Sequence, residues 1–192
     1  MIRGFAMHVR DNITRPAALL IVIIIAAALS MAGNVSGGDA PASLPVDIQA
    51  DLDLALEAYD GGAYGEAKAA WKRGALRGNT DAMTSLANML QRGEGGERDT
   101  ALAFQWYQKA ARRGDTVGQL NLGDMYRSGI GTTANRVEAM FWLTLAGRSG
   151  PGGRQGNAWA AGQARRLATS MSPALRRQIE LKVERWQPTA QP

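Results

Sequence analysis

The stretch GNTDAMTSLANMLQRGEGGERDTALAFQWYQKAARRG (residues 78–114) runs directly into GDTVGQLNLGDMYRSGIGTTANRVEAMFWLTLAGRSG (residues 114–150), and the two superpose at a spacing of 36 residues. A third copy, another 36 residues upstream, is degenerate, with Ala67 and Gly78 in register and Trp71 one residue away from the tryptophan position. A fixed period of this length indicates a repeat protein in which each copy is one supersecondary unit. Identical residues recur in these pairs: Leu86 and Leu122, Met89 and Met125, Gly93 and Gly129, Gly95 and Gly131, Ala103 and Ala139, Trp106 and Trp142, Ala110 and Ala146.

Each copy has the pattern of two helices joined by a glycine-rich loop. Residues 81–91 carry apolar side chains at helical spacing. Gly93 and Gly95 then end that helix, because glycine adopts the left-handed backbone at little steric cost. A second helix starts near Asp99, whose side chain can cap it, and ends at Gly114. One such hairpin cannot bury its own apolar face, so the copies must stack, and the chain is predicted to be an all-α, curved solenoid.

Three short motifs recur in these copies or end them. Leu-Gly-x-Met-Tyr-x-x-Gly-x-Gly spans residues 122–131, Ala-x-x-Trp spans 103–106 and 139–142, and Lys-Ala-Ala-Arg-Arg-Gly spans 109–114. Through these motifs the chain resembles the Sel-1-like repeat family, a relative of the tetratricopeptide repeats, over about residues 64–150. The resemblance implies a right-handed α/α solenoid of about four helical hairpins, and a protein-interaction scaffold or adaptor as the function.

The repeat also divides the chain. The last two helices are expected to cap the array, because repeat arrays need a terminal unit with a polar outer face. Within that cap, Trp159 is expected to pack back onto the last repeat and Trp186 to close the end. The predicted segments are a degenerate first helical hairpin at 46–77, repeat 1 at 78–113, repeat 2 at 114–149, C-terminal capping helices at 150–187 and a tail at 188–192.

The amino terminus has the pattern of an export signal. Arg3, Arg10 and Arg15 precede an uncharged apolar stretch at residues 17–29, and small residues follow. Cleavage after Ala32 would remove a signal peptide at 1–32, leave a flexible linker at 33–45 and give a periplasmic or secreted bacterial protein. The alternative is an uncleaved inner-membrane anchor facing the periplasm, although the strongly apolar part is shorter than the roughly 20 residues that span a bilayer.

A cleaved chain would contain neither histidine nor cysteine, because the one histidine is His8 and lies in the signal. Ser-His-Asp and Cys-His catalysis and the common zinc sites are therefore ruled out, and we predict no catalytic, cofactor or metal site. The glycines at 147, 150, 152, 153 and 156 match neither Walker nor Rossmann spacing and indicate a flexible joint. Capping or solvent-exposed roles, rather than general acid catalysis, are expected for the acidic residues Glu94, Glu97, Asp99, Asp115, Asp124 and Glu138.

The positive charge is partly a property of the ends of the chain. Residues 1–32 hold three of the 22 basic and one of the 17 acidic residues, so the remainder has a net charge of about +3. A basic run on helices near the carboxyl terminus indicates a solvated face, and no nucleic-acid partner is predicted. That run comprises Arg165, Arg166, Arg176, Arg177, Lys182 and Arg185.

Two rows of side chains compete as binding surfaces. Trp71, Trp106 and Trp142 recur beside alanine at helical spacing, which favours a role in the core. The first helix of each hairpin instead carries polar residues that we predict to line the concave face and to bind a partner segment. This predicted row consists of Ser85, Asn88, Gln91, Arg92, Asn121, Asp124, Arg127 and Ser128.

The expected partner is another protein or a peptide segment. By analogy with relatives that hold a membrane sensor or an envelope complex in check, the resemblance points to a periplasmic regulator. An enzyme acting on β-lactams or peptidoglycan, as linked to cysteine-rich relatives, is disfavoured because this chain lacks their paired cysteines and any Ser-x-x-Lys motif. A second alternative is a membrane-tethered structural spacer, which would keep residues 1–32 and have no discrete partner.

Overall fold

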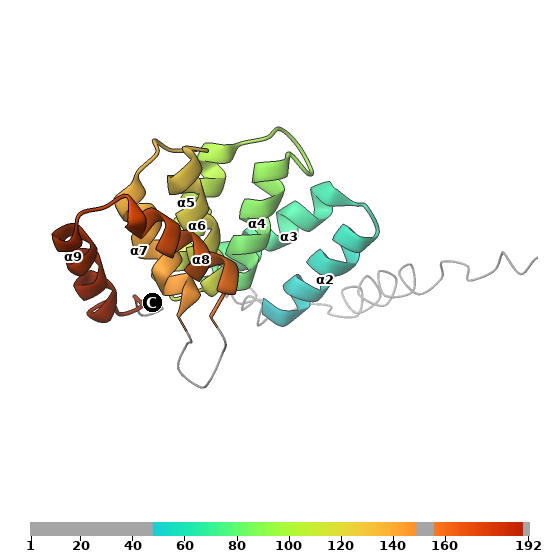
Figure 1. Cartoon of the computed structure of the whole chain (residues 1–192). Coiled ribbons are helices and arrows are strands. Elements are labelled where there is room, and N and C mark those ends of the chain that lie inside the picture. Colours follow the sequence, from blue (N-terminus) through green and yellow to red (C-terminus); the bar gives the residue numbers. More distant parts are fainter. Residues whose placement is uncertain (1–47, 149–155, 190–192) are drawn as a thin grey trace, which may run out of the picture. The chain divides into compact units, whose positions relative to one another are not determined.

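The computed structural model describes residues 48–148 and 156–189, so the predicted signal and linker and the glycines at 150, 152 and 153 lie outside the described residues. Within those two ranges the chain forms helices and no strand (Figure 1). The all-α prediction is confirmed. The helices are α2 (Ile48–Asp60), α3 (Tyr64–Leu76), α4 (Thr80–Arg92), α5 (Thr100–Arg112), α6 (Thr116–Ser128), α7 (Arg136–Gly147), α8 (Ala158–Thr169) and α9 (Pro173–Glu184).

Consecutive helices pack against one another from α2 to α8, as expected of a solenoid. Three hairpins are formed by α2 with α3, α4 with α5, and α6 with α7. The first helices α4 and α6 also pack on the second helix of the hairpin before them. The 36-residue register holds in space, because α6 begins 36 residues after α4, and α7 begins 36 residues after α5.

The turn between hairpins is the same at three places. Its capping side chain accepts a hydrogen bond from the third backbone N–H of the next helix, which satisfies one of the free amides there. Its own backbone N–H donates to a carbonyl near the end of the preceding helix, at 2.9–3.2 Å. The donor and acceptor pairs are Asn79 and Gly74, Asp115 and Ala110, and Asn157 and Ala146.

This turn identifies α8 as the first helix of a further copy. The capping residues Asn79 and Asp115 are 36 residues apart, but Asn157 follows Asp115 by 42. The connection before α8 is therefore longer, so this copy does not fall at the 36-residue period of the sequence. Gly147 permits the approach of α8, since a Cβ on it would lie 2.9 Å from the Cα of Ala161.

Small residues make the helices cross closely at these turns. A Cβ placed on Gly74 would lie 3.0 Å from the Cβ of Ala82, and one placed on Gly118 would lie 2.8 Å from the Cβ of Ala110. Real Cβ atoms rarely approach so closely, so larger side chains at these positions would push the hairpins apart.

The loop inside each full hairpin uses its two glycines differently. Gly93 and Gly129 end α4 and α6 in the left-handed backbone conformation. Two residues later, Gly131 has a φ of +70°, and a Cβ on it would lie 2.7 Å from the carbonyl carbon of Thr100, at the start of α5 in the preceding hairpin. Gly95 meets Tyr64 at the start of α3 in the same way. The second glycine is therefore required both for backbone conformation and for stacking.

The core interpretation of the three tryptophans is confirmed. Trp71, Trp106 and Trp142 are all buried. Trp71 stands 36 residues before Tyr107, so it takes the place of the tyrosine rather than of a tryptophan. The first hairpin also has a shorter loop, residues 61–63, where the other hairpins have residues 93–99 and 129–135. This shorter loop is why the first copy looks degenerate in the sequence.

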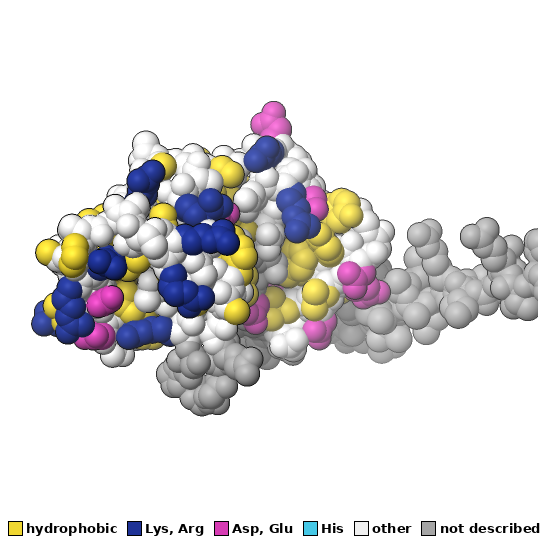
Figure 2. All heavy atoms as spheres, viewed as in Figure 1, with side chains coloured by type: hydrophobic (Ala, Val, Ile, Leu, Met, Phe, Trp, Pro, Cys, Tyr) yellow, Lys and Arg dark blue, Asp and Glu magenta, His cyan; other side chains and the backbone are white. Residues whose placement is uncertain are grey.

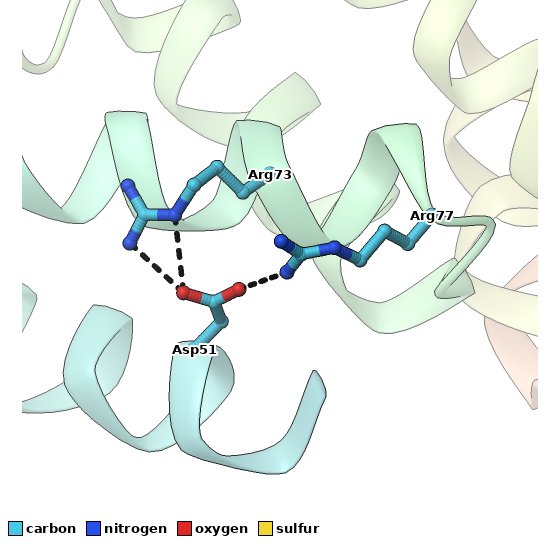
Figure 3. A network of polar contacts seen from close by, with 3 residues as sticks. All are labelled: Asp51, Arg73 and Arg77. Carbon is cyan, nitrogen blue, oxygen red and sulfur yellow. Dashed lines mark hydrogen bonds and ion pairs between the residues drawn. The ribbon is translucent and has the colours of Figure 1, made fainter. Parts of the chain in front are cut away.

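One charged network holds α2 on α3 (Figure 3). Asp51 of α2 accepts hydrogen bonds from Nε and Nη2 of Arg73, at 3.1 and 2.9 Å, and also pairs with Arg77. The hydrogen bond from Arg73 is the main reason why the pKa of Asp51 lies below its usual value. Burial opposes this effect, because it disfavours the charged carboxylate.

The last two helices do not pair as a hairpin does. Both α8 and α9 pack chiefly on α7, and Figure 1 shows α9 standing apart from α8. Trp186 closes the end as predicted, since its ring lies 6.4 Å from the ring of Trp142. The prediction for Trp159 is wrong: this side chain is 48% exposed, because α8 turns Ala160 and Ala164 toward α7 instead.

We expect Gly131→Ala to destabilise the fold much more than Gly129→Ala. Alanine at 129 would make only ordinary van der Waals contacts, but its left-handed backbone conformation would lower the free energy of unfolding by about 1 kcal/mol. Alanine at 131 adds overlap with the backbone of Thr100, for a total of about 3 kcal/mol. Urea unfolding of the two variants measures the difference, and equal losses would contradict the stacking role of the second glycine.

Asp51→Asn should lower the free energy of unfolding by about 1 kcal/mol at neutral pH, a modest amount because both arginines are partly exposed to solvent. The pKa of Asp51 is lower folded than unfolded, so its contribution is complete above about pH 4 and is lost as pH falls through the lowered pKa. Unfolding curves from pH 7 to pH 2 should show the native chain and the variant converging at the acid end. A constant difference would show that the carboxylate charge is not what stabilises the contact.

Candidate functional site

An open groove lies between α2 and α4, with Trp71 of α3 among its walls. It encloses about 350 Å³. Figure 2 shows hydrophobic side chains over α2 and toward α4, with basic and acidic side chains beside them. The lining residues are Leu56, Tyr59, Asp60, Trp71, Ser85, Asn88, Met89, Arg92 and Glu94.

The predicted polar row is divided by the structure. Three of its members, Ser85, Asn88 and Arg92, line the groove. Gln91 does not, but its side chain joins Asn88 in binding the hydroxyl of Tyr107. The groove is therefore formed by one end of the row, together with residues of α2 and α3.

Asn88 and Gln91 have a structural role, because both accept a hydrogen bond from Tyr107. The hydroxyl of Tyr107, a fully buried residue of α5, lies 2.9 Å from Oδ1 of Asn88 and 3.2 Å from Oε1 of Gln91. One hydroxyl carries one proton, so the two amide oxygens share it. Burial raises the pKa of Tyr107 far above its usual value, which keeps the hydroxyl protonated as a donor.

The other half of the row is bonded within its own helix. Asn121 donates to the carbonyl of Val117 at 2.9 Å, and Ser128 donates to the carbonyl of Asp124 at 2.8 Å. Arg127 donates twice to Oδ1 of Asp124, at 2.8 and 2.6 Å. The structure thus does not bring these four residues into the groove.

One corner of the groove is held by contacts that reach from α2 to the loop after α4. The hydroxyl of Tyr59 donates to Oε2 of Glu94 at 3.1 Å, and Arg92 approaches Oε1 of the same carboxylate at 3.6 Å. The hydrogen bond to Glu94 raises the pKa of Tyr59. Glu94 therefore links α2 to the first full repeat, while Arg92 remains largely exposed beside it.

Sequence reasoning missed the residues that α2 contributes. Leu56 and Tyr59 lie three residues apart on one helix, which is a detectable signal of a shared face. The repeat has a 36-residue register, but α2 begins only 32 residues before α4. A shifted helix has no matched positions to compare, so its part in the groove was not foreseen.

Three of the acidic residues considered for catalysis occupy structural positions. Asp99 and Asp115 cap α5 and α6, and burial raises the pKa of Asp115. Glu138 accepts from the indole of Trp142 and pairs with Lys182 at 2.9 Å. Over residues 48–148 and 156–189, no group of three or more histidine, cysteine or acidic side chains is placed to hold a metal. No helix in the same ranges is both long and apolar enough to cross a membrane.

Comparison with known proteins gives one family. The Sel1 repeat model matches residues 80–115 and 116–151, each 36 residues long and two residues later than the predicted boundaries. A solved Sel1 repeat protein from Oxalobacter formigenes is 31% identical, with a TM-score of 0.55, and the match covers 62% of this chain and 89% of that one. No curated protein sequence matches the chain.

A second solved structure supports the fold alone. It is a protective antigen present in uropathogenic Escherichia coli strains and displays an SLR fold. Its sequence is 23% identical, with a TM-score of 0.65, and the match covers 73% of this chain. The present chain spans only 30% of the antigen's length.

Tyr107→Phe should destabilise the chain by about 1 kcal/mol, because it removes the proton that Asn88 and Gln91 accept. Asn88→Ala should then cost less in the Tyr107→Phe background than in the native chain, with a coupling of about 0.5 kcal/mol or more. Thermal and urea unfolding of the four proteins give that value. Asn121→Ala is the matched control, since its amide bonds only within α6; a loss as large as that of Asn88→Ala would refute the role of Tyr107.

Proposed function

The chain belongs to the Sel1 repeat family, and on that premise we propose that it is an exported scaffold that binds another protein in the groove between α2 and α4. Sel1 repeats generally mediate protein–protein interactions. The observation that carries the proposal is the groove itself, which is open to solvent and has apolar walls beside charged ones.

The chemistry of the groove fits an apolar anchor side chain flanked by polar groups. Leu56 and Tyr59 supply most of the apolar surface, and the largely buried side chains of Trp71 and Met89 lie at the floor of the groove. Leu56 is 53% exposed, so its side chain is accessible to a bound segment. Buried apolar anchors surrounded by a polar rim are how protein interfaces obtain most of their binding energy.

The polar rim offers specific hydrogen bonds to the backbone or side chains of a bound segment. The Oδ1 atom of Asn88 faces Tyr107, which leaves its amide NH₂ as the donor for a ligand. Arg92 carries a side chain that is 62% exposed next to Glu94. A helical or extended partner segment with one apolar residue and a nearby carboxylate or carbonyl would match this arrangement.

The predicted export signal supports a partner in the bacterial envelope. The basic amino terminus, the apolar stretch at 17–29 and the small residues up to Ala32 favour a periplasmic or secreted location, or an inner-membrane anchor facing the periplasm if cleavage does not occur. Within that compartment the proposed role is regulation of a membrane sensor or an envelope complex. This role rests on analogy with relatives and not on a feature of the groove.

Site-specific photocrosslinking in the cells that make the protein tests the groove. A photoreactive side chain at Ser85 should form one discrete protein adduct, and Arg92→Glu should reduce that adduct about tenfold by reversing the charge at the rim. The control position is Gln105, which is exposed on α5 and lies outside the groove. An adduct from position 105 and none from 85 would move the binding surface elsewhere.

The same adduct also tests location. Mass spectrometry of the recovered chain should find an amino terminus at Gly33 if the signal is cleaved. A chain that keeps residues 1–32 and forms no discrete adduct would favour the membrane-tethered spacer instead.

A further inference from the structure

A second cavity lies on the other side of α4, where α3, α4 and α5 meet. It encloses about 430 Å³. Leu86 and Leu90 of α4 and Trp106 of α5 form apolar walls, while the groove described above is lined by Ser85 and Met89 of the same helix. The two sites therefore use different faces of α4.

Three basic side chains surround this apolar floor without ion-pair partners. Lys68 and Lys72 come from α3, and Arg98 comes from the loop before α5. Within the part of the chain that the structure describes, none of the three lies within 4.0 Å of a carboxylate oxygen. Lys68 is partly buried, and its ammonium group reaches the loop at Gly96. The ammonium group of Lys68 therefore has no carboxylate partner among the described residues and can pair with a bound anion.

The next junction between hairpins shows that the cations are not needed for stacking. The corresponding junction lies 36 residues later, where α5, α6 and α7 meet. There the rings of Phe104 and Tyr126 pack edge to face with centroids 5.2 Å apart, at the positions of Lys68 and Leu90. Gln108 and Ala134 stand at the positions of Lys72 and Arg98. The same architecture is thus built with a closed aromatic pair and without basic residues at these three positions.

From this contrast we propose that the cavity between α3, α4 and α5 binds an acidic peptide segment, in which one aliphatic or aromatic side chain enters the cavity between flanking carboxylates. The apolar side chain contacts Leu86, Leu90 and Trp106. The carboxylates receive charge-assisted hydrogen bonds from the three basic groups, which are about twice as strong as neutral ones. This site is additional to the groove between α2 and α4 and does not depend on it.

A peptide fits the cavity better than an anionic membrane surface. Glu97 and Asp99 also line the cavity, and a continuous layer of lipid phosphates would be forced against both carboxylates. A single segment can instead place each of its carboxylates beside a lysine or arginine. The cavity is also a discrete hollow and not a flat basic face.

Nuclear magnetic resonance of the purified protein tests the proposal with defined probes. The probes are acetyl-Asp-Leu-Asp-amide, its uncharged counterpart acetyl-Asn-Leu-Asn-amide, and vesicles of phosphatidylcholine and phosphatidylglycerol in equal parts. The acidic peptide should shift the indole N–H signal of Trp106 until the site is saturated. The uncharged Asn peptide should bind about tenfold more weakly. Trp142, which lies in the closed junction, is the internal reference and should not shift.

Two variants transplant the closed junction into the open one. Lys68→Phe with Leu90→Tyr introduces the residues of the Phe104–Tyr126 pair and should fill the cavity and abolish the shift. Lys72→Gln with Arg98→Ala introduces the residues found at 108 and 134, changes only exposed positions, and should weaken binding about tenfold without changing the melting temperature. If the first variant fails to fold, the second still decides the outcome.

Three results would overturn the proposal. The first is equal binding of the acidic and uncharged peptides, because the cations would then contribute nothing. The second is undiminished binding by the Lys72→Gln, Arg98→Ala protein. The third is a Trp106 shift with phosphatidylglycerol vesicles and none with the acidic peptide, which would assign the basic side chains to a membrane surface.

Discussion

The fold depends on the close approach of successive hairpins at a turn where only small residues fit. At that turn a capping Asn or Asp donates its backbone N–H to the last turn of one helix and accepts an N–H from the first turn of the next. Gly74 against Ala82, and Ala110 against Gly118, leave no room for a larger side chain. Because each hairpin cannot bury its own apolar face, this fixed geometry sets how every later copy stacks.

Both candidate binding sites occur where one copy departs from the others. The groove exists because α2 is shifted from the repeat register and joined by a short loop, so that its side chains oppose α4 with space between them. The cavity exists because Lys68 and Leu90 stand where Phe104 and Tyr126 close the next junction. The regular part of the array provides rigidity, and its exceptions provide exposed chemistry.

Polar residues on the first helices illustrate how structural and binding roles divide. Asn88 and Asp124 occupy matched positions, but Asn88 accepts from a buried tyrosine of its own hairpin, whereas Asp124 pairs with Arg127 along one helix. Leu143 takes the position of Tyr107 in the second repeat. The second repeat therefore has no hydroxyl at this position to bond to the α6 residue Asp124. A buried hydroxyl needs an acceptor, and that need constrains Asn88 and Gln91, whereas Asp124 has no such partner.

The sequence by itself determined the repeat, its period, the helix boundaries near Gly93 and Gly129 and the burial of Trp106 and Trp142, because these depend on local backbone preference and on a periodic apolar face. Only the tertiary structure decided that α8 begins a further copy, that Trp159 faces solvent and that Tyr59 and Glu94 meet across the groove. Those features depend on contacts between residues that the 36-residue spacing does not relate to one another. The physical reason is that a period reports what the copies have in common, while a binding site is made where side chains of unlike copies are brought together in space.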